Sequence, residues 1–468
     1  MRREMIGRRR AGVMALAVSG LLAAAACDIT DPLLEVTDPD LIRPEDVKNA
    51  EGAVAVANGA LEFFRELTGG AESTWLFGGL LADEWSTSST FVENDETDQR
   101  RVKVNNGSVE GMFRDLHRTR IAADLAVGAL REFRPDLTRT LAEMYLARGF
   151  AEMQLAQDFC NGIPLGRWEG EEVVSGMPLP IDSIFRRSIA SYDSAIALAT
   201  ATDSATATVR RAAMVGKARA LLGINDETNA PINQAAALVD TIPLSFAYNH
   251  TFAVTSGDNI LWSQPASQRR YTVGDSLEGN ARTDTVRNAI PFFAARDPRV
   301  PVSYTIASNG RDTVKSQDGQ TFSRTTTVWA RTTAVPVMNG LDARLIVAEQ
   351  RLRAMDFAGM MTIMNALRAS PPKLGEVQPA AMASLPVPAD FQTATNLYFR
   401  EKAFWTFSRG QRLGDLRRLI RQYERTEDNT FPVGRHYKGN TYGDDVNLPV
   451  PQAEQNNTNF TQCLDRKA

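Results

Sequence analysis

Apolar residues recur at three- and four-residue steps through long parts of the chain. The first such series begins at Val47 and Ala50, continues through Phe64 and stops at Gly69-Gly70. This spacing places the apolar side chains on one face of an α-helix, and a glycine pair commonly ends one. The same pattern predicts further helices over residues 113–131, 142–153, 181–199, 209–222, 341–355, 357–367 and 397–423. Successive helices that each carry an apolar stripe are expected to pack as antiparallel pairs.

The middle of the chain has a different pattern. Residues 243–337 are rich in Thr, Val, Ser, Arg and Gly, show no helical stripe and contain alternating segments such as 325–330. This composition predicts loops with short strands. A proline-rich stretch, 370–389, predicts a long connection, and the tail from Thr426 reads as loop.

Together these patterns predict a mainly α-helical protein. We expect a single domain over 47–468, in which degenerate tetratricopeptide-like helix pairs occupy 47–242 and 341–425. A loop-rich and partly β insertion is expected over 243–340.

The first 27 residues have the pattern of a targeting segment. Five arginines precede the uncharged run 11–26, which ends in Ala24-Ala25-Ala26-Cys27. The run is shorter than the roughly 20 apolar residues of a membrane-spanning helix, so it reads as a signal peptide over 1–26. Cys27 stands where a lipoprotein is cleaved and acylated; the alternative is an ordinary secretory signal. Residues 27–46, rich in Asp and Pro, predict an extended tether.

Composition narrows the possible chemistry. Three histidines and three cysteines, widely separated among 468 residues, offer few ligands for a zinc or multi-histidine site, and we expect no cofactor. The formal charge of -4, without Lys/Arg blocks in the body, argues against nucleic acid as a partner. In an exported protein Cys160 and Cys463 form either a disulfide or two free thiols.

Five motifs occur in the order found in one known family. They are an aromatic helix running into Gly-x-Pro-Leu at 145–165, the helix 209–223, the pair 341–349 and 363–368, the Arg-Glu, Gly-x-Arg and Asp-Leu-Arg-Arg helix at 400–418, and Leu-Pro-Val-Pro-Gln-Ala-Glu at 448–454. These motifs resemble the SusD/RagB family of nutrient-binding outer-membrane lipoproteins. The sequence departs from that family at Ser408-Arg409, where many members carry a glutamate before the glycine. Charges in the later motifs, at Arg400, Glu401, Arg412, Asp415 and Arg417, are expected to pair with one another and with Glu349.

The resemblance implies a binding protein that catalyses no reaction. Such a protein would be lipid-anchored at the outer membrane, at the cell surface, where it captures a glycan or a peptide. It would pass this ligand to a SusC-like TonB-dependent transporter.

Aromatic residues outside the helical stripes are the candidates for ligand contact, because a sugar ring stacks its C–H face on an aromatic side chain. We expect a loop over 75–91 with exposed platforms at Trp85 and Phe91 and with Asp83 and Glu84 beside them. Further platforms are expected at Trp262 and Tyr271 in the insertion. Trp75 and Trp329 are weaker candidates. The alternative is that these rings fill the helical core.

Two other classes of protein remain open. A lipid-anchored glycoside hydrolase would need a pair of carboxylates, which the sequence does not locate. The sequence also lacks Gly-x-Ser-x-Gly, His-Glu-x-x-His and phosphate-loop motifs. A helical-repeat lipoprotein that assembles envelope proteins would bind no nutrient.

Overall fold

The computed structural model describes residues 48–69, 73–169, 172–226 and 228–468. The predicted signal peptide 1–26, the lipidation site Cys27 and the tether 27–46 lie outside the described residues.

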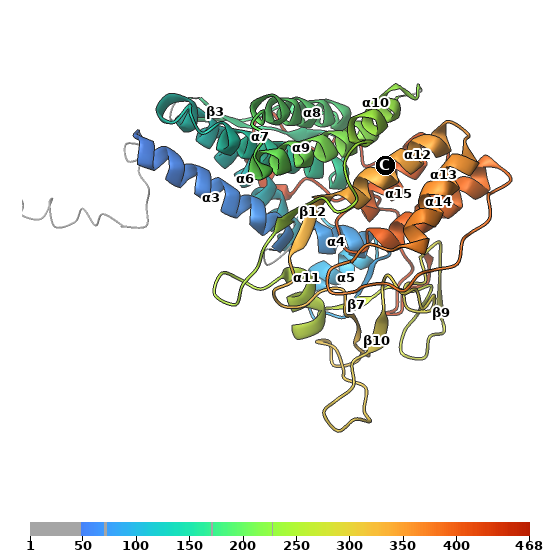
Figure 1. Ribbon diagram of the computed structural model, residues 1–468. Coiled ribbons are helices and arrows are strands. Elements are labelled where there is room, and N and C mark those ends of the chain that lie inside the picture. The colour runs from blue at the N-terminus through green and yellow to red at the C-terminus, as the bar shows by residue number, and fades with distance from the viewer. Residues whose placement is uncertain (1–47, 70–72, 170–171, 227) are drawn as a thin grey trace, which may run out of the picture.

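The N-terminal half is a row of packed helices. Each packs on the next along the chain from α6 onward, and α3 packs on α6. Figure 1 shows this row across the top of the molecule. Gly149 of α7 and Gly216 of α9 both face the Tyr192 ring of α8, so closely that a Cβ at Gly216 would lie 2.5 Å from that ring. The members are α3 (Ala50–Gly69), α6 (Gly107–Phe133), α7 (Thr138–Asp158), α8 (Ile181–Leu198), α9 (Ser204–Gly223) and α10 (Ala230–Val239).

A second group of helices continues from this row, since α12 packs on α10. It comprises α12 (Gly340–Arg353), α13 (Phe357–Ala369), α14 (Phe391–Trp405) and α15 (Arg412–Gln422). The prediction of one helix over 397–423 is wrong, because the chain turns between α14 and α15. Ser408 and Gly410 have φ of 55° and 62°. A side chain at Gly410 would collide with the Trp75 indole, because its Cβ would lie 2.1 Å from the nearest ring atom. A residue in the left-handed conformation commonly ends a helix.

Short antiparallel strands make up much of the remainder. The insertion is closed by β6 (Ala247–His250) paired with β12 (Val335–Asn339), and β1 (Trp85–Thr87) pairs with β7 (Tyr271–Val273). The other pairings are β2 (Ile163–Pro164) with β5 (Pro178–Leu179), β3 (Arg167–Glu169) with β4 (Glu172–Val174), β10 (Val302–Tyr304) with β11 (Arg324–Thr326), and the sheet β13 (Val433–Gly434), β9 (Asp284–Arg287), β8 (Leu277–Glu278). The mainly α fold with a loop-rich, partly β middle segment is confirmed.

Two local predictions fail. The strand expected over 325–330 is limited to 324–326, and the insertion also holds a helical turn, α11 (Ile260–Trp262), followed by a π-turn, Ser263–Ser267. The segment 75–91 is not a loop: it contains α4 (Thr74–Leu81) and β1, and α5 (Val92–Asp98) follows. Every residue of α4 is buried. A helix buried all round has no polar face, so its sequence carries no stripe to recognise.

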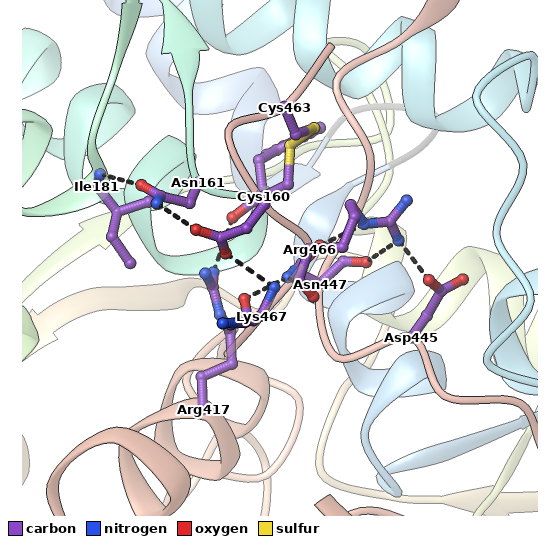
Figure 2. Close-up of a disulfide and its surroundings, with 11 residues drawn as sticks. Cys160, Asn161, Ile181, Arg417, Asp445, Asn447, Cys463, Arg466 and Lys467 are labelled. Carbon is purple, nitrogen blue, oxygen red and sulfur yellow. Dashed lines mark hydrogen bonds and ion pairs between the residues drawn. A yellow bond between two sulfur atoms is a disulfide. The ribbon is translucent and has the colours of Figure 1, made fainter.

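A disulfide fastens the C-terminal tail to the end of α7. Cys160 and Cys463 are bonded, with Cα atoms 6.1 Å apart (Figure 2). Beside it, Asn161 Nδ2 donates to Asp465 Oδ2 at 2.7 Å, and the Leu464 amide donates to the Asn161 carbonyl at 2.8 Å. The tail is thus held by covalent and polar contacts together.

Charged side chains are buried between the helices, and they pair differently from expectation. Glu349 of α12 is reached by Arg418, with Arg418 Nη1 3.2 Å from its carboxylate, and it also accepts from the Tyr423 hydroxyl at 2.8 Å. Burial alone raises the pKa of Glu349, but the charge of Arg418 and its other partners lower it to about 2. Glu401 pairs with Arg299 and Arg368 instead of with its own helix. We call Glu349, Asp342, Asp415 and their cationic partners the interior charge network.

Candidate ligand-binding site

Trp85, Tyr271 and Asp83 are core residues, and the expectation that they are exposed is wrong. The Trp85 side chain is 1% exposed and Tyr271 is fully buried, because β1 and β7 pair beneath the surface. The Trp85 ring packs on Phe407 at 5.1 Å. Asp83 accepts two hydrogen bonds from Arg412, each 2.7 Å, and a third from the Ile290 amide. In this conformation these side chains offer no surface to a ligand.

The weaker candidates and Glu84 are also structural. Trp75 is fully buried, and Trp329, 4% exposed, donates from its indole to Ser408 Oγ at 2.6 Å. The Glu84 carboxylate accepts from the Ser408 amide at 2.8 Å, and burial raises the pKa of Glu84 to about 8. These contacts hold the turn between α14 and α15 in place.

Phe91 differs from these residues, because its ring is 42% exposed. It stands at the start of α5, where its amide donates to Ser89 Oγ at 3.0 Å. Ser89 Oγ and the Thr90 amide both donate to the Gln317 side-chain carbonyl, at 3.0 and 3.2 Å. The Arg270 guanidinium lies over the ring, 4.5 Å from its centroid. The ring is therefore held at the surface by a polar frame.

Backbone hydrogen bonds make that frame rigid. The Ser88 amide donates to the Arg270 carbonyl at 2.9 Å, and the Gln317 amide donates to the Arg269 carbonyl at 3.0 Å. The Asp318 amide donates to the Ser88 carbonyl at 3.1 Å. Three segments distant in sequence thus lie side by side beneath Phe91.

A fourth segment reaches the same surface from the C-terminal part of the chain. Lys438 Nζ donates to Asp95 Oδ1 at 2.7 Å and to the Ser89 carbonyl at 2.9 Å, and it lies 3.7 Å from Asp318 Oδ2. Lysine and carboxylate side chains are therefore grouped close to Phe91.

An open hollow is lined by Ser263, Gln264 and Gln268 of the segment that leads to Arg270. Its volume is about 510 Å³, and it is lined by Arg65, Asp258, Gln268 and Arg331 among others. Arg331 Nε donates to Asp258 Oδ1 at 2.6 Å. Trp262, half-buried in α11, directly precedes Ser263, which lines the hollow. We call the hollow together with Phe91, Arg270, Gln317 and Lys438 the polar strip.

The polar strip combines groups that bind a neutral polar ligand. A partly exposed aromatic ring offers an apolar face, while amide, guanidinium and carboxylate side chains offer donors and acceptors of both kinds. Of the predicted residues, the structure places Phe91 here, whereas Trp262 is half-buried against the hydrophobic core and does not line the hollow. Sequence reasoning missed Arg270, Gln317 and Lys438, because only folding brings their segments together.

The part of the chain that the structure describes shows no group of three His, Cys, Asp or Glu side chains arranged to hold a metal ion. Over the same residues, no helix combines the length and the apolar character needed to cross a bilayer.

Known proteins resemble this chain in structure but not in sequence. No family model matches it, and no curated protein does so either. A SusD superfamily protein from Bacteroides fragilis superposes with a TM-score of 0.64 at 14% identity, covering 90% of this chain and 100% of that one. A SusD-like carbohydrate binding protein from Bacteroides vulgatus gives 0.57 at 12% identity, with 88% and 97% covered.

A laminarin binding SusD-like protein gives a TM-score of 0.56 at 14% identity, covering 89% of this chain and 99% of that one. The match extends over nearly the whole length of each structure, and it agrees with the motifs found in the sequence. The chain has the fold of the SusD superfamily.

Proposed function

We propose that this protein is a lipid-anchored, non-catalytic binding protein of the outer membrane. It captures a glycan along the polar strip and passes it to a SusC-like TonB-dependent transporter. Acylated Cys27 holds it on the membrane, and the segment 27–46 separates the anchor from the folded body.

The observation that carries this proposal is the exposed Phe91 ring, framed by Arg270, Gln317 and Lys438 next to an open hollow. A sugar that covers roughly 100 Å² of such a ring gains about 2.5 kcal/mol at about 25 cal/mol per Å². Much of that gain is cancelled by the entropy of association. Binding therefore also requires the polar groups of the hollow, which supply hydrogen bonds to hydroxyl groups.

Two further observations support the proposal. The structural neighbours include proteins described as carbohydrate binding and laminarin binding. The sequence before Cys27 has the charged start, uncharged run and small residues of a lipoprotein signal.

Retention on immobilised polysaccharides tests the binding role. We expect Phe91→Ala to weaken binding of a retained glycan about tenfold or more, corresponding to the loss of about 1.4 kcal/mol or more. Trp168→Ala is the matched control, because Trp168 is 41% exposed but lies on β3, which Figure 1 shows among the helices at the top of the molecule, apart from α5. Equal retention of Phe91→Ala and wild type would remove Phe91 from the site. Product release from any glycan would exclude a purely binding role.

A peptide is the alternative ligand class. The same two variants can be tested against a library of peptides. The ligand class whose binding is lost in Phe91→Ala and kept in Trp168→Ala is the one that uses this site. Binding of peptides alone, sensitive to Phe91→Ala, would keep the site and change its ligand.

Anchoring and partnership are tested in cells. We expect fatty-acid labelling of the wild type and none of Cys27→Ala. A large TonB-dependent barrel should co-purify with the wild-type protein from detergent-solubilised membranes. Recovery of envelope-assembly proteins instead would favour a scaffold role.

A further inference from the structure

A small cavity that shares no lining residue with the polar strip lies where helices of both groups meet. It is bordered by Gln157 of α7, Arg219 of α9, Asp342 of α12, Lys402 of α14 and Arg417 of α15. Its volume is about 40 Å³. A buried water needs about 10 to 15 Å³ measured in this way, so the cavity has room for only a few waters or one small ion.

Positive charge dominates its wall. Five of the lining side chains are cations, namely Arg219, Lys402, Arg417, Arg418 and Arg421, and two are carboxylates, Asp342 and Asp415. Most of the cations are paired. Lys402 lies 2.6 Å from Asp415, Arg421 lies 2.8 Å from Asp182, and Arg418 pairs with Glu349. Asp342 forms a salt bridge with Arg409, with the Arg409 Nη2 atom 2.8 Å from its carboxylate.

Two of the lining arginines, Arg219 and Arg417, form no salt bridge within the described residues. Arg219 is 8% exposed; its Nη1 donates to the Val337 carbonyl at 3.2 Å, and its Nη2 has no hydrogen-bond partner among the described residues. Arg417 is 2% exposed; its Nη1 donates to three carbonyls at the end of α7, and its Nε and Nη2 have no hydrogen-bond partner in the part of the chain that the structure describes. Burial lowers the pKa of Arg417 to about 9.

Two carboxylates, Asp158 and Asp465, stabilise the charge of Arg417 from nearby, but both already accept hydrogen bonds from other groups. Asp158 accepts from Gln154 Nε2 at 2.5 Å, and burial raises the pKa of Asp158 to about 7, so it is only partly charged. Asp465 accepts from Asn161 Nδ2 at 2.7 Å and from the Lys467 amide at 2.9 Å. Two buried guanidinium groups thus retain unused N–H donors at one cavity.

We propose that this cavity binds a small inorganic anion of halide size, held by Arg219 and Arg417. Buried guanidinium N–H groups without an acceptor are unfavourable, and an anion supplies the missing acceptors. The volume excludes sugars and nucleotides. Because the wall comes from α7, α9, α12 and α15, the ion would join the N-terminal row of helices to the second group.

Crystals of the wild-type protein grown with bromide in place of chloride test the site directly. We expect an anomalous peak within hydrogen-bond distance of both Arg219 and Arg417. Density in the cavity without an anomalous signal would assign it to water and overturn the proposal. This measurement requires no variant.

Thermal unfolding gives a second readout. At constant ionic strength, replacing a large organic anion by chloride should raise the melting temperature in a saturable way. Arg219→Gln should abolish the saturable part, whereas Arg311→Gln, at an exposed loop position, should keep it. An equal response of all three proteins would show a general salt effect and overturn the proposal. Should Arg219→Gln not fold, the bromide measurement on the wild type decides.

Discussion

The interior charge network and the polar strip are built from the same residue types but occupy opposite environments. In the interior, the Arg418–Glu349 and Arg409–Asp342 pairs have side chains at most 8% exposed. In the strip, Arg331 and Asp258 are 49% and 30% exposed. Breaking a buried pair leaves an uncompensated charge, whereas a surface pair exchanges readily with water. Solvent exposure, more than residue type, therefore separates the structural ion pairs from the candidate ligand-binding groups.

The largest effect is expected at the centre of the interior network. Glu349→Gln leaves Arg418 without its main counterion and should lower the free energy of unfolding by about 3 to 5 kcal/mol. Urea denaturation measures it. Asp193→Asn is the control, because Asp193 is 51% exposed and pairs with Lys217 on the surface. It should change stability by less than about 1 kcal/mol. Similar losses in both variants would erase the contrast drawn between the two regions.

The disulfide comes next in magnitude. Cys160→Ala with Cys463→Ala opens a link between residues 303 positions apart. The free energy of unfolding should fall by about 2 to 4 kcal/mol, because the unfolded chain regains entropy. A reductant should produce the same shift in the wild type and none in the double variant. Ligand binding at the polar strip should be unchanged, since the bond lies at the end of α7.

Buried Glu84 gives the interior a pH dependence. Its pKa is about 8 in the folded protein against an ordinary value of 4.5, so the folded state keeps a proton that the unfolded chain releases. Its contribution is fully present below the ordinary value and is lost as pH rises towards 8.

Relative to Glu84→Gln, the wild type should therefore lose at least about 1 kcal/mol of stability between about pH 5 and about pH 8. Denaturation at a series of pH values, on both proteins, measures this difference. Parallel curves would show that Glu84 is ionised in the folded state.

The smallest effect on stability is expected at Phe91. Phe91→Ala should change the free energy of unfolding by about 0.5 kcal/mol or less, as surface substitutions usually do, while it weakens glycan binding. Thermal unfolding of the variant beside Trp168→Ala measures it. A large loss of stability would assign Phe91 to the core and break the contrast between the two regions.

The site was harder to predict than the fold, for an identifiable reason. Trp85 and Phe91 lie six positions apart in a segment without a helical stripe, so the sequence treats them alike. Pairing of β1 with β7 buries Trp85, whereas the frame of Ser89 and Gln317 keeps Phe91 at the surface. The break between α14 and α15 was missed similarly, because Gly410 turns there to accommodate the distant Trp75 ring.

The sequence alone determined the helical class, most helix positions and the loop-rich middle, because the period of apolar residues is a local property of the chain. It also indicated that Cys160 and Cys463 could form a disulfide. Tertiary structure decided which arginine meets Glu349, which aromatic ring stays in water and which buried guanidinium groups form no salt bridge within the described residues. Each of these depends on residues far apart in sequence whose distance and exposure exist only once the helices have packed.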